Sequence, residues 1–290
     1  MQDILSNIAR QLEALGHECY WADEGFAGGD DTYVLLTEGF FGNHLEVMRD
    51  ACARGIKFII LATEAPGQTG FNAGLTDELI ARQRTFPQAA SYAHAIWCTI
   101  KDSVPWYSRF GRPAAHLELG YAPASVRHPE NPAGLDHDYG FFGSMTPRRY
   151  KMLHQFARSK VDGHRARVRY TSFETVHNRD AQMVRCRVIL QIRPHEKMAM
   201  LSSSRCATAL HIGRPVIAEH HVEVGAWKDI IEFAHPDVFT IKAAKMHARW
   251  EAAHAEQFER FRALLPPEKC VGETIRLTLS LSREKTVVEI

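Results

Sequence analysis

Hydrophobic residues in the first half of the chain recur at two different spacings. Over the first 15 positions they lie three or four residues apart, from Ile4 to Leu15, and Gly16 follows. This predicts an amphipathic helix with a glycine cap. Short apolar runs then alternate with helical patterns, predicting a doubly wound α/β domain with a parallel sheet covered on both faces. The predicted strands are 18–22, 33–37, 57–63 and 94–100, and the predicted helices lie near 43–54 and 75–92.

A second α/β rhythm follows an aperiodic segment. Residues 121–138 hold three prolines and Gly134 without periodicity, which predicts a linker. A long helical pattern at 241–265 ends at Pro266, and the alternating TIRLTLSLS segment at 274–282 predicts an added edge strand. Between linker and long helix, the predicted strands are 139–144, 168–173, 187–193 and 215–219, and the predicted helices are 148–159, 175–185 and 202–212.

Two such halves predict a fold of two Rossmann-like doubly wound domains facing across a cleft, where open α/β sheets bind ligands at the carboxyl ends of their strands. The chain opens with a helix, although a doubly wound domain normally opens with a strand. The first strand of the N-terminal domain is therefore either missing or supplied from elsewhere. No G-x-G-x-x-G fingerprint is present, which argues against an ordinary NAD-binding domain.

Composition narrows the class of protein. The 290 residues carry a formal net charge of +1, so no global field attracts nucleic acid or membrane. The composition is that of a globular protein, not of a disordered, collagen-like or coiled-coil chain. The six cysteines form no C-x-x-C pair, the N-terminus lacks a signal-like apolar region, and no window predicts a membrane span. We therefore expect a cytoplasmic protein with reduced cysteines.

Two helix starts carry the residue types that bind phosphate. Ser202, Ser203, Ser204 and Arg205 begin a helix after the strand that ends at Arg193. At a helix N-terminus, hydroxyls, free N–H groups and guanidinium groups can all donate hydrogen bonds to the oxygens of a diphosphate. Ordinary helix capping is the alternative for these serines.

The second helix start follows the strand at 139–144. Gly143 permits close approach of a ligand, Ser144 can donate to phosphate oxygens, and Thr146-Pro147 predicts the N-cap and first turn of a helix bearing Arg148 and Arg149. The alternative is a capped helix with solvated arginines.

These residues resemble a known family. The pattern FGSMTPRR (142–149), followed by VILQIRP and SSSRCATALHIGRPVIAE (202–219), is similar to the C-terminal nucleotide-sugar half of GT-B-fold glycosyltransferases, bacterial members above all. The resemblance covers about residues 139–220; before that, only the α/β rhythm and the GHE after the first helix match. Where relatives carry glutamate or another carboxylate, this chain has Ser202 and Thr208.

The resemblance implies an acceptor-side domain at 1–122, a linker at 123–138 and a nucleotide-sugar domain at 139–240. It also implies that residues 241–290 form a long helix that packs back on the N-terminal domain, followed by a tail strand. UDP or another nucleoside diphosphate of a sugar donor would be the co-substrate, and no bound metal is expected. The implied donor-binding residues are Gly143, Ser144, Arg149, Arg193, Ser203, Ser204, Arg205 and Glu219.

Candidate catalytic carboxylates lie in the first half. Glu64 and Glu38 follow predicted strands in glycine-containing loops, where either could deprotonate an acceptor hydroxyl. The alternative is that they complement helix dipoles. His44 and His116 are weaker candidates. Glu219, His220, His221 and Glu223 form the densest group of ligand-type residues, which a polar strand end explains better than a metal site does.

Two further features bear on the acceptor. Residues 148–169 hold eight Lys or Arg and a single acid, Asp162. This is a solvated face or a site for an anionic acceptor such as nucleic acid. Four aromatic residues close the first half and form either a sugar platform or buried core. They are Trp97, Trp106, Tyr107 and Phe110.

The leading hypothesis is a metal-independent glycosyltransferase that moves a sugar from a nucleotide-sugar donor to an unidentified acceptor, whether glycan, small molecule or nucleic acid. Two alternatives stay open: a nucleotide-sugar epimerase, which needs acid and base carboxylates on both sides of the donor, and a degenerate, non-catalytic nucleotide-binding module.

Overall fold

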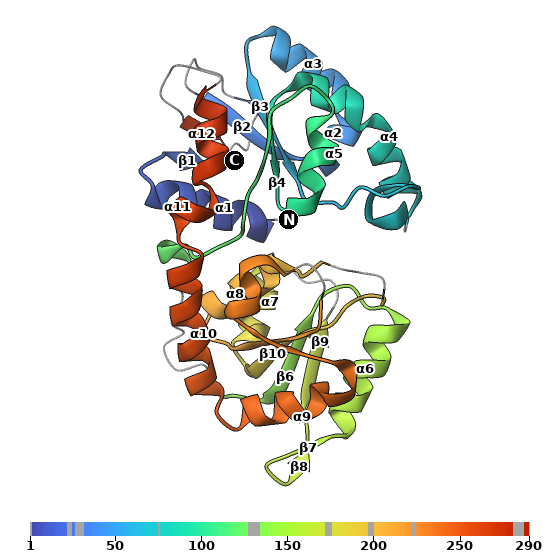
Figure 1. Cartoon of the computed structure of the whole chain (residues 1–290), viewed down its shortest axis with the longest axis vertical. Coiled ribbons are helices and arrows are strands. Elements are labelled where there is room, and N and C mark those ends of the chain that lie inside the picture. Colours follow the sequence, from blue (N-terminus) through green and yellow to red (C-terminus); the bar gives the residue numbers. More distant parts are fainter. Residues whose placement is uncertain are drawn as a thin grey trace. The chain divides into compact units, whose positions relative to one another are not determined.

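The computed structural model describes residues 2–21, 25–26, 32–74, 76–126, 134–171, 176–196, 200–221, 224–280 and 287–289. The chain divides into two compact units. Unit 1 comprises Met1–Asn7 and Gly120–Pro266, and unit 2 comprises Ile8–Leu119 and Pro267–Ile290. Each unit contains its own parallel sheet (Figure 1).

The sheet of unit 2 is parallel throughout, in the order β1-β13-β2-β3-β4-β5. Its central strands are buried apolar runs, as the sequence predicts. The strands are β1 (Cys19–Tyr20), β2 (Thr32–Thr37), β3 (Lys57–Ala62), β4 (Ala93–Cys98), β5 (Ala114–His116) and β13 (Val287–Glu289).

Strand β13 explains why this domain opens with a helix. It lies between β1 and β2 and runs parallel to both. In a doubly wound sheet of order 2-1-3-4-5, that place belongs to the strand that precedes the first helix. If β13 is counted as strand 1, the six strands have the order 2-1-3-4-5-6, which is that order with one more strand, β5, at the edge. The C-terminal segment therefore supplies the strand that is missing at the start.

The helices of unit 2 pack on an aromatic-rich core that includes Phe58, Phe71, Phe86 and Tyr107. Helix α1 (Gln2–Ala14) begins in the segment assigned to unit 1 and continues into unit 2. The others are α2 (Glu38–Asn43), α3 (Leu45–Ala53), α4 (Asp77–Tyr92), α5 (Val104–Ser108), α11 (Pro267–Cys270) and α12 (Gly272–Ser280), with 3₁₀ turns at Phe71–Gly74 and Lys101–Ser103.

Helix α12 corrects the prediction of an edge strand at 274–282. Thr274 and Thr278 are buried four residues apart, on one face of the helix. Their hydroxyls donate to the carbonyls of Val271 (2.7 Å) and Thr274 (2.8 Å), and Trp97 Nε1 donates to Thr278 Oγ1 at 3.0 Å. The buried face is therefore polar, whereas the alternation of leucines had suggested a strand.

The sheet of unit 1 is also parallel, in the order β12-β11-β10-β6-β9. Numbered along the chain, its five strands have the order 2-1-3-4-5 from the β9 edge. They are β6 (His137–Phe142), β9 (Val168–Thr171), β10 (Cys186–Gln191), β11 (Val216–Glu219) and β12 (Glu232–Ala234), and a separate antiparallel pair is formed by β7 (Lys160–Val161) and β8 (His164–Arg165).

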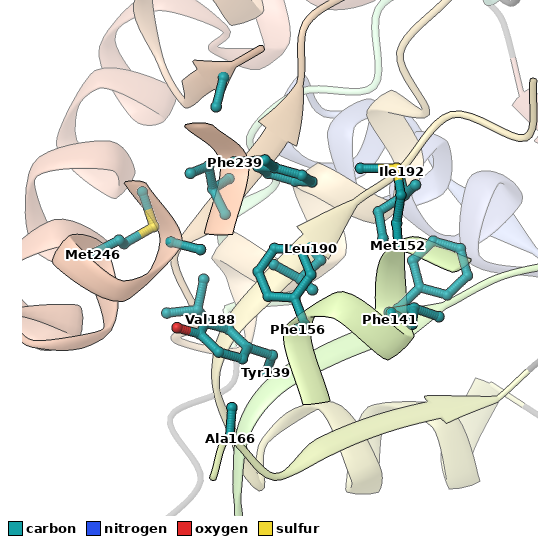
Figure 2. Close-up of a cluster of buried hydrophobic side chains, with 14 of the residues drawn as sticks. Tyr139, Phe141, Met152, Phe156, Ala166, Val188, Leu190, Ile192, Phe239 and Met246 are labelled. Carbon is teal, nitrogen blue, oxygen red and sulfur yellow. The ribbon is translucent and has the colours of Figure 1, made fainter. Parts of the chain in front are cut away.

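The core of unit 1 lies between this sheet and its helices. Figure 2 shows Tyr139, Phe141 and Leu190 of the strands beside Phe156 and Met152 of α6. The helices are α6 (Pro147–Arg158), α7 (Val176–Met183), α8 (Ser203–His211), α9 (Pro236–His247) and α10 (Trp250–Leu264), with 3₁₀ turns at Pro123–Ser125 and Gly225–Asp229.

Residues 241–265 differ from the prediction in two ways. They form parts of two helices, because Arg249 leaves the helical conformation at φ −134°. Both helices belong to unit 1, where Phe239 and Ala253 enter its core. The helices of 241–265 are thus part of unit 1, whereas the rest of the predicted 241–290 segment, from Pro267 on, is part of unit 2.

No helix in the described part of the chain is long and apolar enough to cross a membrane.

Candidate functional site

The candidate site in unit 1 lies where the strand order reverses. Strands β6 and β10 are neighbours, and their connections leave in opposite directions, which places a crevice at their carboxyl ends in sheets of this type. Gly143 follows β6 and Arg193 follows β10. The loop segments are joined, since Thr146 Oγ1 donates to the carbonyl of Pro194 at 2.9 Å.

Arg149 is a buried cation at this place. Thr146 caps α6 by accepting from the N–H of Arg149 at 3.3 Å. The Arg149 guanidinium lies 5.1 Å from the centre of the Phe141 ring and donates to the carbonyls of Ile192 (2.8 Å) and Ser144 (2.7 Å). Burial, followed by the nearby Arg205 and Arg148, lowers the pKa of Arg149 to about 9.

Arg205 is a second cation at this place; it is half-buried and lies in the first turn of α8. Its guanidinium lies 5.9 Å from the Phe141 ring, and its Nε donates to Ser202 Oγ at 3.0 Å. Its Nη1 would stand 2.7 Å from a Cβ at position 143, which accounts for Gly143. Burial lowers the pKa of Arg205 as well.

Neither charge is paired with a carboxylate among the described residues, although Glu219 favours the charged form of Arg149 from a longer distance. No described carboxylate lies within 4 Å of Arg149 or Arg205, and the two guanidinium groups donate to carbonyls and a hydroxyl. A buried cation without a counter-charge is costly. The arrangement can therefore bind an anion.

Glu219 and Arg193 behave differently from the prediction. Glu219 is fully buried, and its carboxylate pairs with Arg148 and with Arg193 Nη2 at 3.1 Å. It also accepts from the N–H of Arg193 at 3.0 Å. Its pKa is lowered, because the bonds from Arg148 and Arg193 outweigh its desolvation. Arg148, not chosen from the sequence, thus completes a closed ion-pair group.

The serines lie, as predicted, at the start of α8. Ser202 occupies the N-cap position without a side-chain capping bond, and its Oγ instead accepts from Arg205. Ser203 and Ser204 begin the helix. The N–H groups of Ser204 and Arg205, in the first turn of α8, have no acceptor among the described residues. Ser144 is exposed, and its carbonyl is held by Arg149.

In unit 2 the two candidate carboxylates meet in one turn. Glu38 follows β2 and is buried, and its Oε1 accepts from the N–H groups of Thr63 and Glu64, each at 2.6 Å. Burial and then the charge of Glu64 raise the pKa of Glu38 to about 7. Glu38 thus holds the backbone of the loop that carries Glu64.

Glu64 is less buried and is positioned by Asn72, a residue that the sequence did not single out. Asn72 Nδ2 donates to Glu64 Oε2, and Asn72 Oδ1 accepts from the N–H of Ala65 at 3.0 Å. The φ of Asn72 is +50°, which asparagine tolerates better than most residues. Burial raises the pKa of Glu64, which favours a proton acceptor near neutral pH.

The remaining candidates of unit 2 have structural partners. Trp97 and Tyr107 are buried, and Trp106 and Phe110 pack against the same core. This favours the core interpretation over a sugar platform. His116 lies 3.8 Å from Glu118, and the ring of His44 packs against Phe40.

The metal interpretation finds no support in the parts of the chain that are described. Glu219 is held by arginines, and His221 Nδ1 contacts the carbonyl of Glu219. Glu223 lies outside the described residues. No group of three potential metal ligands occurs among the residues described.

Comparison with solved structures identifies proteins of similar fold, whereas comparison of sequences does not. No family model matches the sequence, and no curated protein sequence matches it. An alpha-glucosyltransferase solved with UDP and a 13-mer DNA is similar in structure at 9% identity, with a TM-score of 0.61, over 95% of this chain and 94% of that one.

Two other solved structures are similar. TarM has a TM-score of 0.56 at 9% identity over 86% of this chain, which spans only 55% of the length of TarM. Sucrose-phosphate synthase from Thermosynechococcus elongatus has a TM-score of 0.51 at 13% identity, over 86% of this chain and 73% of that one. The chain has the GT-B glycosyltransferase fold, with two Rossmann-like α/β domains.

Proposed function

We propose that this protein is a glycosyltransferase that binds a nucleoside-diphosphate sugar, UDP-sugar in the first place, on unit 1 and transfers the sugar to an acceptor hydroxyl. The observation that carries the proposal is the pair Arg149 and Arg205. The buried guanidinium group of Arg149 and the half-buried one of Arg205 lie at the reversal point of a doubly wound sheet, and neither has a described carboxylate within 4 Å. A diphosphate is the anion that such a place accommodates.

The chemistry follows from the charge that develops in transfer. When the glycosidic bond to the donor breaks, the leaving diphosphate gains negative charge, and preorganised cations and helix N-terminal N–H groups stabilise it. Arg149, Arg205 and the start of α8 are the groups proposed for this role. Since they offset the charge themselves, we propose that the transfer proceeds without a bound metal.

The acceptor side is proposed to use unit 2. Glu64 is the proposed base, because it is the more exposed of the two carboxylates and has a raised pKa. Glu38 is proposed as the residue that positions it, because both of its short bonds go to the Thr63–Glu64 backbone.

A nucleotide-binding module without transfer is the second candidate. One observation favours it. Glu219, the carboxylate expected to contact the donor, is instead paired with Arg148 and Arg193. The two candidates differ in turnover: a transferase releases nucleoside diphosphate from its donor, whereas the module binds the diphosphate and releases none.

Titration calorimetry with UDP, GDP, ADP and TDP tests the donor site. We expect the wild type to bind one of them, and Arg205→Met to bind it about 100-fold more weakly, since a charged hydrogen bond of about 3 kcal/mol is lost. Arg82→Met, on α4 of unit 2, is the matched control with unchanged affinity. No binding of any of the four nucleotides at millimolar concentration would refute the proposal.

Glu64→Gln tests the base. We expect unchanged nucleotide affinity and a loss of about 100-fold or more in donor turnover, the usual contribution of a general base. Addition of EDTA is expected to leave turnover unchanged. Equal turnover in Glu64→Gln and wild type would exclude Glu64 as the base.

A further inference from the structure

The outer face of α6 and the hairpin that follows it carry an unusual combination of side chains. We propose that this surface binds single-stranded nucleic acid through its phosphates and bases. In Figure 1, α6 lies along the outside of the sheet of unit 1 and leads to the β7–β8 hairpin. We call the surface the α6 stripe; it comprises Tyr150, Lys151, Arg158, Lys160, Arg165 and Tyr170.

The cations of the stripe are exposed and available. Lys151, Arg158, Lys160 and Arg165 are all exposed, and none is within 4 Å of a described carboxylate. The only acid between residues 147 and 171 is Asp162. It is already engaged by Arg187 at 3.4 Å. The stripe thus presents unneutralised positive charge although the whole chain is close to neutral.

The hairpin places two of these cations directly opposite each other. Lys160 pairs with Arg165 in the antiparallel register, across a turn in which Asp162 and Gly163 have φ values of 48° and 82°. These angles fit the tight two-residue turn that fixes the register. Like charges facing across strands destabilise a hairpin, and a bound phosphate relieves that repulsion.

Two exposed aromatic side chains complete the stripe. Tyr150 is 55% exposed and Tyr170 is 43% exposed, and their rings form an edge-to-face pair with centroids 6.5 Å apart. Tyr150 lies on α6, and Tyr170 lies on the edge strand β9. Exposed rings beside a line of cations are the arrangement on which unstacked bases pack while their phosphates are neutralised. A duplex keeps its bases stacked and offers nothing to these rings.

Fluorescence anisotropy with a labelled oligothymidylate of about 20 nucleotides tests the proposal. With four phosphate contacts, the affinity of the wild type should fall about 50-fold between about 50 and about 200 mM salt. Lys151→Glu/Arg158→Glu should bind at least about 10-fold more weakly at low salt and lose about half of the salt dependence. No binding by the wild type at low salt would overturn the proposal.

Control variants separate the stripe from general charge and from folding. Arg260→Glu/Arg262→Glu makes the same charge change on the exposed face of α10 and should leave the affinity within about twofold. An equal loss in this control would overturn the assignment to the stripe. Tyr150→Phe should retain binding and Tyr150→Ala should lose about 10-fold. Duplex binding as tight as single-strand binding, or tighter binding to anionic lipid vesicles, would contradict the proposal.

This surface does not depend on the donor site. UDP titration and oligonucleotide titration use different residues, so the failure of either proposal is visible while the other stands.

Discussion

Units 1 and 2 can be compared strand by strand, because with β13 as the first strand the sheet of unit 2 has the order 2-1-3-4-5-6 and the sheet of unit 1 has the order 2-1-3-4-5. In unit 1 the loops at the carboxyl ends gather guanidinium groups, with Arg149 and Arg205 against Phe141. In unit 2 the equivalent ends carry Glu38 and Glu64. One architecture thus presents opposite charges at the same edge of its sheet.

The two units also differ in how their first strand is supplied. In unit 1 the strand β6 is continuous with the helix that follows it. In unit 2 the helix α1 comes first, and β13 is delivered from the other end of the chain. The order of the strands in the sheet, rather than their order along the chain, therefore determines where a doubly wound sheet binds its ligand.

The largest expected effect concerns the closed ion-pair group of unit 1. Glu219→Ala removes a buried carboxylate and leaves Arg148 and Arg193 unpaired, so we expect a loss of about 4 kcal/mol in the free energy of unfolding. Urea denaturation measures it. Glu259→Ala, which breaks an exposed pair with Arg262, is the control and should change stability by less than about 0.5 kcal/mol. Similar losses in both variants would contradict the interpretation.

The pH dependence of the same group has a definite sign. Because the pKa of Glu219 is lowered in the folded protein, its contribution is present above the pKa of the unfolded chain and is lost as the pH falls through the folded value. The difference between wild type and Glu219→Ala should therefore shrink on acidification.

A proline in β13 tests whether this strand completes the sheet of unit 2. Val288→Pro removes a backbone donor from a strand with a neighbour on each side, and should destabilise unit 2 by about 3 kcal/mol. Hydrogen exchange should accelerate at β1 and β2 but not at β6 and β10. Val288→Thr keeps the N–H group and serves as control. Unchanged exchange at β2 in the proline variant would contradict the placement of β13.

Glu38 gives a smaller effect that depends on pH. Its pKa is raised to about 7 by burial, so the folded protein holds this proton more tightly than the unfolded chain. The stability from this group is fully present below the unfolded pKa of about 4.5 and is lost as the pH rises through about 7. Glu38→Gln cannot ionise and should gain about 2 kcal/mol on wild type between about pH 5 and pH 9. Thermal unfolding across that range measures it, and a constant difference would count against the raised pKa.

The smallest effect separates binding from structure in unit 1. Because Arg205 is half-buried, has no described carboxylate within 4 Å and repels Arg149, Arg205→Met should raise the stability of the unliganded protein by about 1 kcal/mol while nucleotide binding is lost. Thermal unfolding without and with UDP measures both. A destabilised Arg205→Met variant would show that Arg205 is held for structure.

The periodicity of apolar residues predicted most strands and helices, because burial of parallel strands requires continuous apolar runs. It failed at 274–282, where buried threonines satisfy their hydroxyls within a helix, and at 241–265, where the chain leaves the helix at Arg249. Residue types at helix starts predicted Arg149 and Arg205. They could not reveal that Glu219 is closed off by Arg148, nor that Asn72 holds Glu64, because these pairs are distant in the sequence.

The sequence by itself determined the two α/β halves and the cationic helix starts of the second half, since local periodicity and composition carry that information. The tertiary structure alone decided which arginines pair with a carboxylate and which strand completes the sheet of unit 2. Both depend on residues that meet only after folding: Glu219 with Arg148 and Arg193, and Val288 with Tyr33 and Cys19. Pairing across such distances follows from the packing of the whole sheet, which no local pattern records.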